Sequence, residues 1–272
     1  MAIIVGFFFL RDVDYRLFDI LTFIFCAIGT FEVARAVKGY LYKGNFTLSV
    51  IFGSIFVPVF FVFENYTGFG GGYACLILVA LAAIYQAAFS LVKKSNFAGF
   101  CVNALPFVYP ALLLLTILCA NRLELGFIAL LLIFVISPCA DTFAYLVGMT
   151  YNKIRKGKAK KMCPRLSPKK TWAGAIGGVI GGIIGAIVVY FAVDKTGIVA
   201  TAKISPVIIF IIIGAVASVF TEIGDLFESY IKRKAGIKDI GKIMPGHGGV
   251  MDRIDGMSFA AAVVYCIFVL LL

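Results

Sequence analysis

Eight long apolar runs constrain this chain more than any other feature of its sequence. Most contain about the 20 residues that an α-helix needs to cross the hydrocarbon core of a bilayer. They cover approximately residues 17–38, 46–63, 73–92, 98–120, 125–150, 172–193, 205–229 and 257–272. Hydrophobic residues make up 62% of the chain and charged residues only 14%, a balance that excludes an ordinary water-soluble domain. We expect an all-α polytopic membrane protein, because a helix satisfies its backbone hydrogen bonds internally in lipid.

The number of transmembrane helices depends on the first residues of the chain. Residues 2–10 form a further apolar run, about half as long as a full crossing requires, so eight or nine helices are expected. This start lacks the basic stretch and the small-residue cleavage site of a secretory signal peptide. We expect a single integral membrane domain over residues 1–272. Its N-terminal helices would cover about 1–120, and a C-terminal part, about 121–272, would carry the chemically active motifs.

Lysine and arginine are distributed unequally between the polar segments. One alternating set of segments carries 19 basic residues and the other carries 5. The richer set consists of 38–45, 93–97, 151–171 and 230–256. Because basic residues accumulate on the cytoplasmic side of membrane proteins, we expect this set, and the polar site at the ends of its helices, to face the cytoplasm.

The run at 172–193 contains two interleaved rows of glycine. The rows are Gly174, Gly178, Gly182 and Gly177, Gly181, Gly185. Small residues at a spacing of four let another helix approach closely. That helix could belong to the same chain, which is the favoured interpretation, or to a second copy in a homodimer.

Several carboxylates lie within the apolar runs, where ionisable groups are costly and usually functional. Asp141 lies in the cytoplasmic half of its run, and Glu222, Asp225 and Glu228 recur at a spacing of three near the end of theirs. Such spacing keeps side chains on one side of a helix. Repulsion makes this cluster unfavourable unless a cation lies nearby. Glu228 could instead be solvated at the membrane interface.

An early run holds two further acidic residues, Asp19 and Glu32. Arg35 follows Glu32 by three residues. We interpret these groups as structural ion-pair partners.

The segment "IMPGHGGVMDRIDG", residues 243–256, is polar although apolar runs flank it. Its glycines permit close approach of the backbone to a ligand, and Asp252 and Asp255 stand at the entrance to the last helix. Carboxylates such as Asp225 and Asp252 suit Mg²⁺, which commonly binds one or two carboxylates together with substrate phosphates. Basic residues surround this set. A metal among basic side chains and glycine amides is typical of a polyphosphate site.

Two parts of this pattern have simpler explanations. Most of "KIRKGKAKK", residues 153–161, is expected to be a solvated run that faces anionic lipid head groups. His247, the only histidine, is either an ordinary loop histidine or a phosphate contact.

Residues 229–255, "SYIKRKAGIKDIGKIMPGHGGVMDRID", resemble the C-terminal signature of phosphatidate cytidylyltransferases, also called CDP-diacylglycerol synthases. The preceding "SVFTEIGDLFES" resembles the family's Gly-Asp-Leu-x-Glu-Ser helix end. Further upstream, "ADTFAYLVG" and "RLSPKKTWAGAIGG" resemble two more family elements. The resemblance extends from about Pro138 to the end of the chain, and more weakly over the N-terminal half.

This resemblance implies a reaction in which CTP and phosphatidic acid give CDP-diacylglycerol and pyrophosphate, as a step of phospholipid biosynthesis that requires Mg²⁺. Asp225 and Asp252 match the family's metal-binding aspartates, and a second cation is compatible with the pattern. Its catalytic positions are matched by Asp225, Asp252, Asp255, Lys232, Arg233 and Asp141. Its substrate-binding positions are matched by Ser167, Lys169, Lys170, Thr171, Lys238, Asp239, His247, Gly248, Gly249 and Arg253.

The expected partners are CTP, phosphatidic acid and membrane lipid, with no nucleic acid, and the expected location is a bacterial-type cell membrane. Two other functions remain as alternatives. A membrane CTP-dependent lipid kinase would phosphorylate a lipid alcohol. A transporter is less favoured, because transporters usually place their charges near the membrane midplane at interrupted helices.

Overall fold

A computed structural model describes residues 11, 13–38, 45–67, 70–92, 97–193, 205–243 and 248–271. The helices are α2 (Tyr15–Ala36), α3 (Asn45–Val62), α4 (Gly71–Val92), α5 (Phe97–Phe107), α6 (Leu113–Asn121), α7 (Gly126–Ile154), α8 (Trp172–Ala192), α10 (Pro206–Lys234) and α11 (Met251–Leu271). Two π-helical turns, η2 (Phe63–Thr67) and η3 (Val108–Leu112), and two strands, β1 (Lys161–Cys163) and β2 (Ser167–Thr171), complete the order.

The all-α polytopic class is confirmed. Among the described residues, eight helical segments are long and apolar enough to cross a membrane, and each corresponds to one of the eight predicted runs. The short run at residues 2–10 lies outside the described residues. The fourth span, Gly99–Asn121, is continuous through η3. Proline cannot donate to a helical ladder, and Pro106 and Pro110 stand where α-helical geometry gives way to the π-turn.

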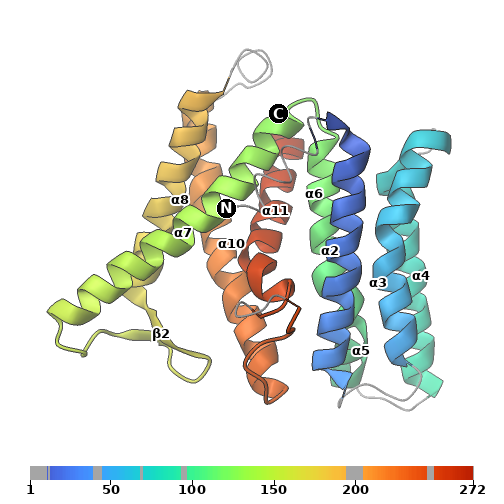
Figure 1. The fold of residues 1–272 in the computed structure, drawn as a ribbon, viewed down its shortest axis with the longest axis horizontal. Coiled ribbons are helices and arrows are strands. Elements are labelled where there is room, and N and C mark those ends of the chain that lie inside the picture. The colour runs from blue at the N-terminus through green and yellow to red at the C-terminus, as the bar shows by residue number, and fades with distance from the viewer. Residues whose placement is uncertain are drawn as a thin grey trace. The chain divides into compact units, whose positions relative to one another are not determined.

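The chain divides into two compact units. One comprises residues 1–118 and 234–253, and the other comprises residues 119–233 and 254–272. In the first unit α2 packs on α3 and α5, and α3 packs on α4 (Figure 1). The backbone oxygen of Asn103 accepts hydrogen bonds from Ser49 Oγ (3.2 Å) and Gln86 Nε2 (3.3 Å). Polar contacts of this kind join helices in lipid.

In the second unit the glycine rows of α8 allow close packing within the chain. All six glycines are buried. A Cβ atom at Gly181 would meet Phe143 of α7, and one at Gly182 would meet Ser218 of α10. The favoured interpretation of the rows is therefore confirmed, and a second copy of the chain is not needed to explain them.

The segment between α7 and α8 contains an antiparallel hairpin that the sequence analysis did not predict. Lys161 pairs with Thr171, and Cys163 pairs with Ser167. Gly157, at φ +83°, ends α7 by donating to Asn152 O at 2.9 Å, as in a Schellman cap. The strands are short and basic, so they carry little β-strand signal in the sequence. The hairpin fixes the position of β2 at the start of α8.

The order of the spans predicts that positions 158 and 238 lie on the same side of the membrane. Two spans, α8 and α10, separate them, and two crossings return the chain to its starting side. Single cysteines introduced at Lys158 and Lys238, in a background without the native cysteines, should be labelled from one side of sealed vesicles only. Labelling from opposite sides would contradict the assignment of the spans.

Candidate active site

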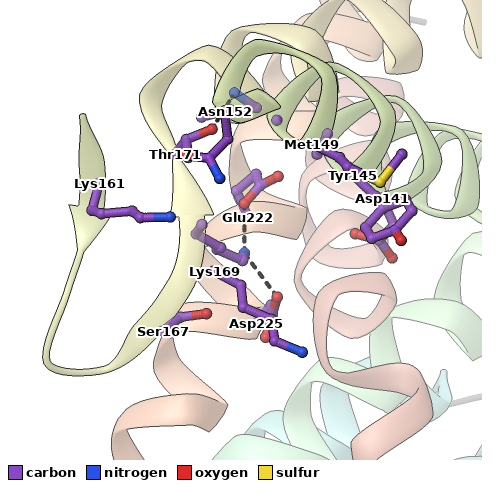
Figure 2. A pocket seen from close by; sticks show the side chains of 15 residues that line it. Asp141, Tyr145, Met149, Asn152, Lys161, Ser167, Lys169, Thr171, Glu222 and Asp225 are labelled. Carbon is purple, nitrogen blue, oxygen red and sulfur yellow. Dashed lines mark hydrogen bonds and ion pairs between the residues drawn. The ribbon is translucent and has the colours of Figure 1, made fainter. Parts of the chain in front are cut away.

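A cavity of about 530 Å³ lies in the second unit, between α7, the hairpin, α8 and α10 (Figure 2). Six of the predicted site residues line it: Asp141, Ser167, Lys169, Lys170, Thr171 and Asp225. They are as many as 84 positions apart in the sequence, so the tertiary fold brings them together. The cavity combines carboxylates, lysines and hydroxyl groups.

Lys170 is the central cation of this cavity. Its Nζ lies 2.5 Å from Glu222 Oε2 and 2.8 Å from Asp225 Oδ2. In Figure 2 dashed lines mark these ion pairs at the labelled Glu222 and Asp225. Burial lowers the pKa of Lys170, but the charges and hydrogen bonds of Asp225 and Glu222 raise it by more, so the pKa lies above the ordinary value for lysine. Lys170 is therefore cationic at neutral pH.

The local structure of β2 and α8 explains how Lys170 reaches α10. Thr171 is the N-cap of α8, and its side chain accepts a hydrogen bond from Gly174 N at 3.0 Å, the usual role of threonine at this position. The cap sets the point at which the strand becomes a helix. Lys170, the preceding residue, is half-buried and points to the carboxylates of α10.

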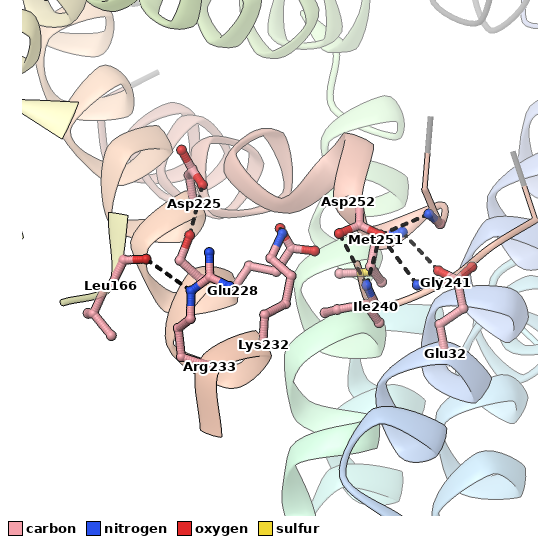
Figure 3. A network of polar contacts seen from close by, with 12 residues as sticks. Glu32, Leu166, Asp225, Glu228, Lys232, Arg233, Ile240, Gly241, Met251 and Asp252 are labelled. Carbon is pink, nitrogen blue, oxygen red and sulfur yellow. Dashed lines mark hydrogen bonds and ion pairs between the residues drawn. The ribbon is translucent and has the colours of Figure 1, made fainter. Parts of the chain in front are cut away.

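Three carboxylates form a second acidic group in the same unit. Asp225 and Glu228 of α10 and Asp255 of α11 each offer an oxygen within 4.8 Å of the others. Glu228 is fully buried; its Oε2 lies 3.0 Å from Lys232 Nζ, while its Oε1 accepts no hydrogen bond from the described residues (Figure 3). An oxygen-only donor set of this kind suits a hard divalent cation.

The acidic group depends on close packing of α10 against α11. A Cβ atom at Gly224 would meet the backbone oxygen of Asp255 and the ring of Phe259, and a Cβ atom at Gly256 would meet Thr221. The two glycines thus let the carboxylates of the two helices approach.

Arg233, at the end of α10, is exposed, and its Nε donates to Leu166 O in the hairpin at 3.4 Å.

Residues 229–255, which carry the C-terminal signature, are called the signature segment. In the first unit, Asp252 accepts hydrogen bonds from the backbone of this segment. Its carboxylate accepts from Ile240 N (3.0 Å), Gly241 N (3.3 Å) and Gly249 N (2.8 Å) (Figure 3). Gly248, at φ +87°, has a conformation that favours glycine. The role of Asp252 as a metal ligand stays a prediction, and so does substrate binding by Gly248 and Gly249.

The predicted ion pair between Glu32 and Arg35 is wrong. Glu32 is 3% exposed, and its oxygens accept hydrogen bonds from Val250 N (3.2 Å) and Met251 N (3.1 Å). Arg35 is exposed, and the described residues include no ion pair between the two. A spacing of three predicts that helical neighbours can meet, but it carries no information about a backbone segment more than 200 positions away.

The remaining predicted residues are not part of the cavity lining. Lys238, Asp239 and Arg253 are exposed in the first unit. His247 lies outside the described residues, so both interpretations of it stay predictions.

The sequence analysis missed some residues of the cavity. Lys161 and Asn152 line it, although Lys161 ends the run that was interpreted as mostly lipid-facing. The hairpin, in which Lys161 pairs with Thr171, brings this lysine to the cavity. Glu222 was noticed for its spacing but was not proposed as a site residue. The spacing of three residues between Glu222 and Asp225 indicates that both carboxylates lie on the same side of one helix.

Comparison with known families decides the relationship of this chain. A family model described as "Cytidylyltransferase family" matches residues 1–271. The chain belongs to the cytidylyltransferase family. The match includes the N-terminal helices, where the motif resemblance was weaker.

Individual relatives agree with the family assignment. A protein of Rickettsia typhi named phosphatidate cytidylyltransferase is 34% identical over 229 residues, which cover 82% of this chain and 92% of the relative. One of Rickettsia prowazekii with the same name is 32% identical over 195 residues, 72% of this chain and 80% of the relative. A Brucella abortus protein with that name is 38% identical over 140 residues, and the chain spans 46% of its length.

Replacement of Lys170 by methionine should destabilise the protein. The change keeps the length of the side chain but leaves Glu222 and Asp225 without their cation. Breaking a buried ion pair costs about 3–5 kcal/mol. Because Asp225 is 37% exposed, we expect about 1–3 kcal/mol, measured by thermal unfolding in detergent.

Two further variants control this prediction. Lys169→Met changes the adjacent, exposed lysine and should alter the unfolding temperature little. The double variant Lys170→Met/Glu222→Gln should regain part of the lost stability, because it removes one of the two uncompensated charges. A Lys170→Met protein as stable as the unchanged protein would contradict the stabilising role of the ion cluster.

Proposed function

We propose that this protein transfers the cytidylyl group of CTP to phosphatidic acid and so forms CDP-diacylglycerol and pyrophosphate. The observation that carries the proposal is the match to the Rickettsia typhi phosphatidate cytidylyltransferase over 92% of that protein's length. The family model over residues 1–271 supports the same class of reaction. Within the second unit, lysines and carboxylates line one cavity, as a polyphosphate substrate would require.

The proposed reaction is an in-line substitution at phosphorus. A phosphate oxygen of phosphatidic acid forms a bond to the α-phosphorus of CTP, and the bond from that phosphorus to the pyrophosphate oxygen breaks. A phosphate monoester has a second pKa of about 6, so the attacking oxygen is already largely ionised at neutral pH. A strong general base is therefore not required.

The main task of the protein is to bring two polyanions together. Lys161, Lys169 and Lys170 line the cavity and can offset the phosphate charges electrostatically. The hydroxyl of Ser167 lies in the same lining and can donate to a phosphate oxygen. On the α7 wall, Tyr145 and Met149 are exposed and can contact the apolar part of a lipid whose acyl chains stay in the bilayer.

The acidic group fits a magnesium ion. Asp225 with Glu228 and Asp255 would hold it, since all three carboxylates converge and one oxygen of Glu228 accepts no hydrogen bond from the described residues. When bound, Mg²⁺ would neutralise triphosphate charge and make the α-phosphorus more electrophilic. For Asp252, which belongs to the first unit, a role as metal ligand is proposed from the family resemblance alone, and a second cation would need further oxygen donors.

We place the protein in the bacterial cell membrane with its site facing the cytoplasm. The eight spans found among the described residues make it an integral membrane protein, and the relatives with which it was compared are bacterial. The cytoplasmic orientation is supported by the 19 basic residues of one set of segments against 5 of the other. CTP is available on that side.

The position of the label in CTP tests the reaction directly. With purified protein, phosphatidic acid and Mg²⁺ in detergent, CTP labelled at the α-phosphate should give a labelled lipid. CTP labelled at the γ-phosphate should give labelled pyrophosphate and no labelled lipid. The reverse pattern would identify a lipid kinase. Absence of labelled lipid from both would contradict the proposed function.

Replacement by asparagine of either aspartate predicted to bind metal should abolish most of the activity. Asp225→Asn and Asp252→Asn each keep the shape of the side chain and remove one negative charge. We expect a rate loss on the order of 100-fold, about 2.7 kcal/mol of transition-state stabilisation, and a higher Mg²⁺ requirement. Rates measured against Mg²⁺ concentration check this.

A matched control for these variants is Lys158→Ala, in the exposed turn after α7, which should lose far less activity. A further variant, Glu228→Gln, tests whether Glu228 is one of the ligands of the ion. It should raise the Mg²⁺ requirement only if the group of Asp225, Glu228 and Asp255 holds the ion. An asparagine variant with near-normal rate and Mg²⁺ dependence would exclude that aspartate as a ligand.

A further inference from the structure

Glu32 of α2 is a buried carboxylate to which the sequence analysis gave only a structural role. It lies in the first unit together with residues 234–253. It accepts hydrogen bonds from Val250 N and Met251 N, 218 and 219 positions further along the chain. We propose that Glu32 is a positioning residue that holds the signature segment in its active conformation. The proposal rests on the function proposed above and on the substrate contacts predicted for Lys238, Asp239 and Arg253 of this segment.

The hydrogen bond from Met251 N to Glu32 provides an acceptor for an N–H group at the start of α11. Met251 is the first residue of α11, and the first N–H groups of a helix have no partner within it. The N-terminus of a helix also carries partial positive charge. A carboxylate from a distant helix therefore satisfies an orphan donor and stabilises the start of α11. Asp252 and Arg253, both proposed site residues, stand in that first turn.

Two glycines of the segment also lie against Glu32. A Cβ atom at either Gly241 or Gly249 would meet the Glu32 carboxylate. Both glycines are buried, so a side chain at either position would displace the Glu32 carboxylate. The same glycines donate their N–H groups to Asp252.

Two carboxylates thus hold the segment through consecutive backbone donors. Gly249 N donates to Asp252, whereas Val250 N and Met251 N donate to Glu32 (Figure 3). Asp252 belongs to the segment itself, but Glu32 comes from α2 and ties the segment to the N-terminal helices. The exposed side chains of Lys238, Asp239 and Arg253 depend on this backbone for their positions. Residues that orient a site in this way commonly affect activity by 10–100-fold.

The test compares Glu32→Gln with Glu32→Asp in the full-length protein. Glutamine keeps the volume but replaces one acceptor oxygen by an NH₂ group that cannot accept from a backbone N–H. We expect kcat/KM for CTP to fall by at least tenfold, with the Mg²⁺ requirement raised and the unfolding temperature changed little. Aspartate keeps both acceptor oxygens and should restore part of the loss.

Glu64→Gln is the matched control. Glu64 is also a carboxylate of the first unit that accepts from a backbone N–H, that of Gly71 at 2.6 Å. It contacts a different segment, so its loss should leave kcat/KM and Mg²⁺ dependence unchanged. Equal kinetic losses in Glu64→Gln and Glu32→Gln would overturn the proposal, since any weakened backbone contact would then suffice.

Hydrogen exchange provides a readout that is independent of activity. In Glu32→Gln the amides of Val250 and Met251 should exchange at least tenfold faster than in the unchanged protein, and those in Glu64→Gln should not. Unchanged exchange would overturn the anchoring by Glu32. Faster exchange with unaltered kinetics would show an anchor without a positioning role and would also overturn the proposal. If the unchanged protein makes no labelled lipid from CTP, the proposed function fails, and the exchange comparison still decides the anchoring.

Discussion

The rest of this structure depends on one constraint: acidic side chains within membrane-spanning helices need a cation or hydrogen-bond donors beside them. An isolated carboxylate in a low-dielectric environment is strongly disfavoured, yet this chain places several near the ends of its spans. Some of these groups are compensated across the fold and others within one helix. Lys170 joins the hairpin to Glu222 and Asp225 of α10, and Lys232 lies beside Glu228 within α10.

The two units compensate their carboxylates by different means. In the second unit Lys170 and Lys232 lie beside carboxylates of α10, and a lysine can exchange a carboxylate for a phosphate when a polyanion binds. In the first unit Glu32 and Asp252 accept hydrogen bonds from backbone N–H groups, which cannot rearrange without moving the chain. The first arrangement suits a group that binds substrate or metal. The second suits a group that fixes a loop.

Glycine makes both arrangements possible, since close approach of backbones is what brings the charges together. The glycine rows of α8 let α7 and α10 pack tightly around the cavity, and Gly224 and Gly256 bring α10 and α11 close enough for Asp225, Glu228 and Asp255 to converge. In the signature segment, Gly241 and Gly249 leave room for Glu32. A larger residue at any of these positions would separate a carboxylate from its partners.

The sequence by itself determined the membrane class, the eight spans and the family, because apolar runs and motif spacing are local properties of the chain. It also indicated that Asp141, Lys170 and Asp225 belong to one site, through their resemblance to family motifs. Only the tertiary structure decided that Lys161 and Asn152 join that cavity, since their short basic hairpin has no periodic signal. It alone decided the partner of Glu32. A carboxylate that bonds to backbone amides more than 200 positions away leaves no pattern in side-chain identity or spacing, because every residue except proline offers the same donor.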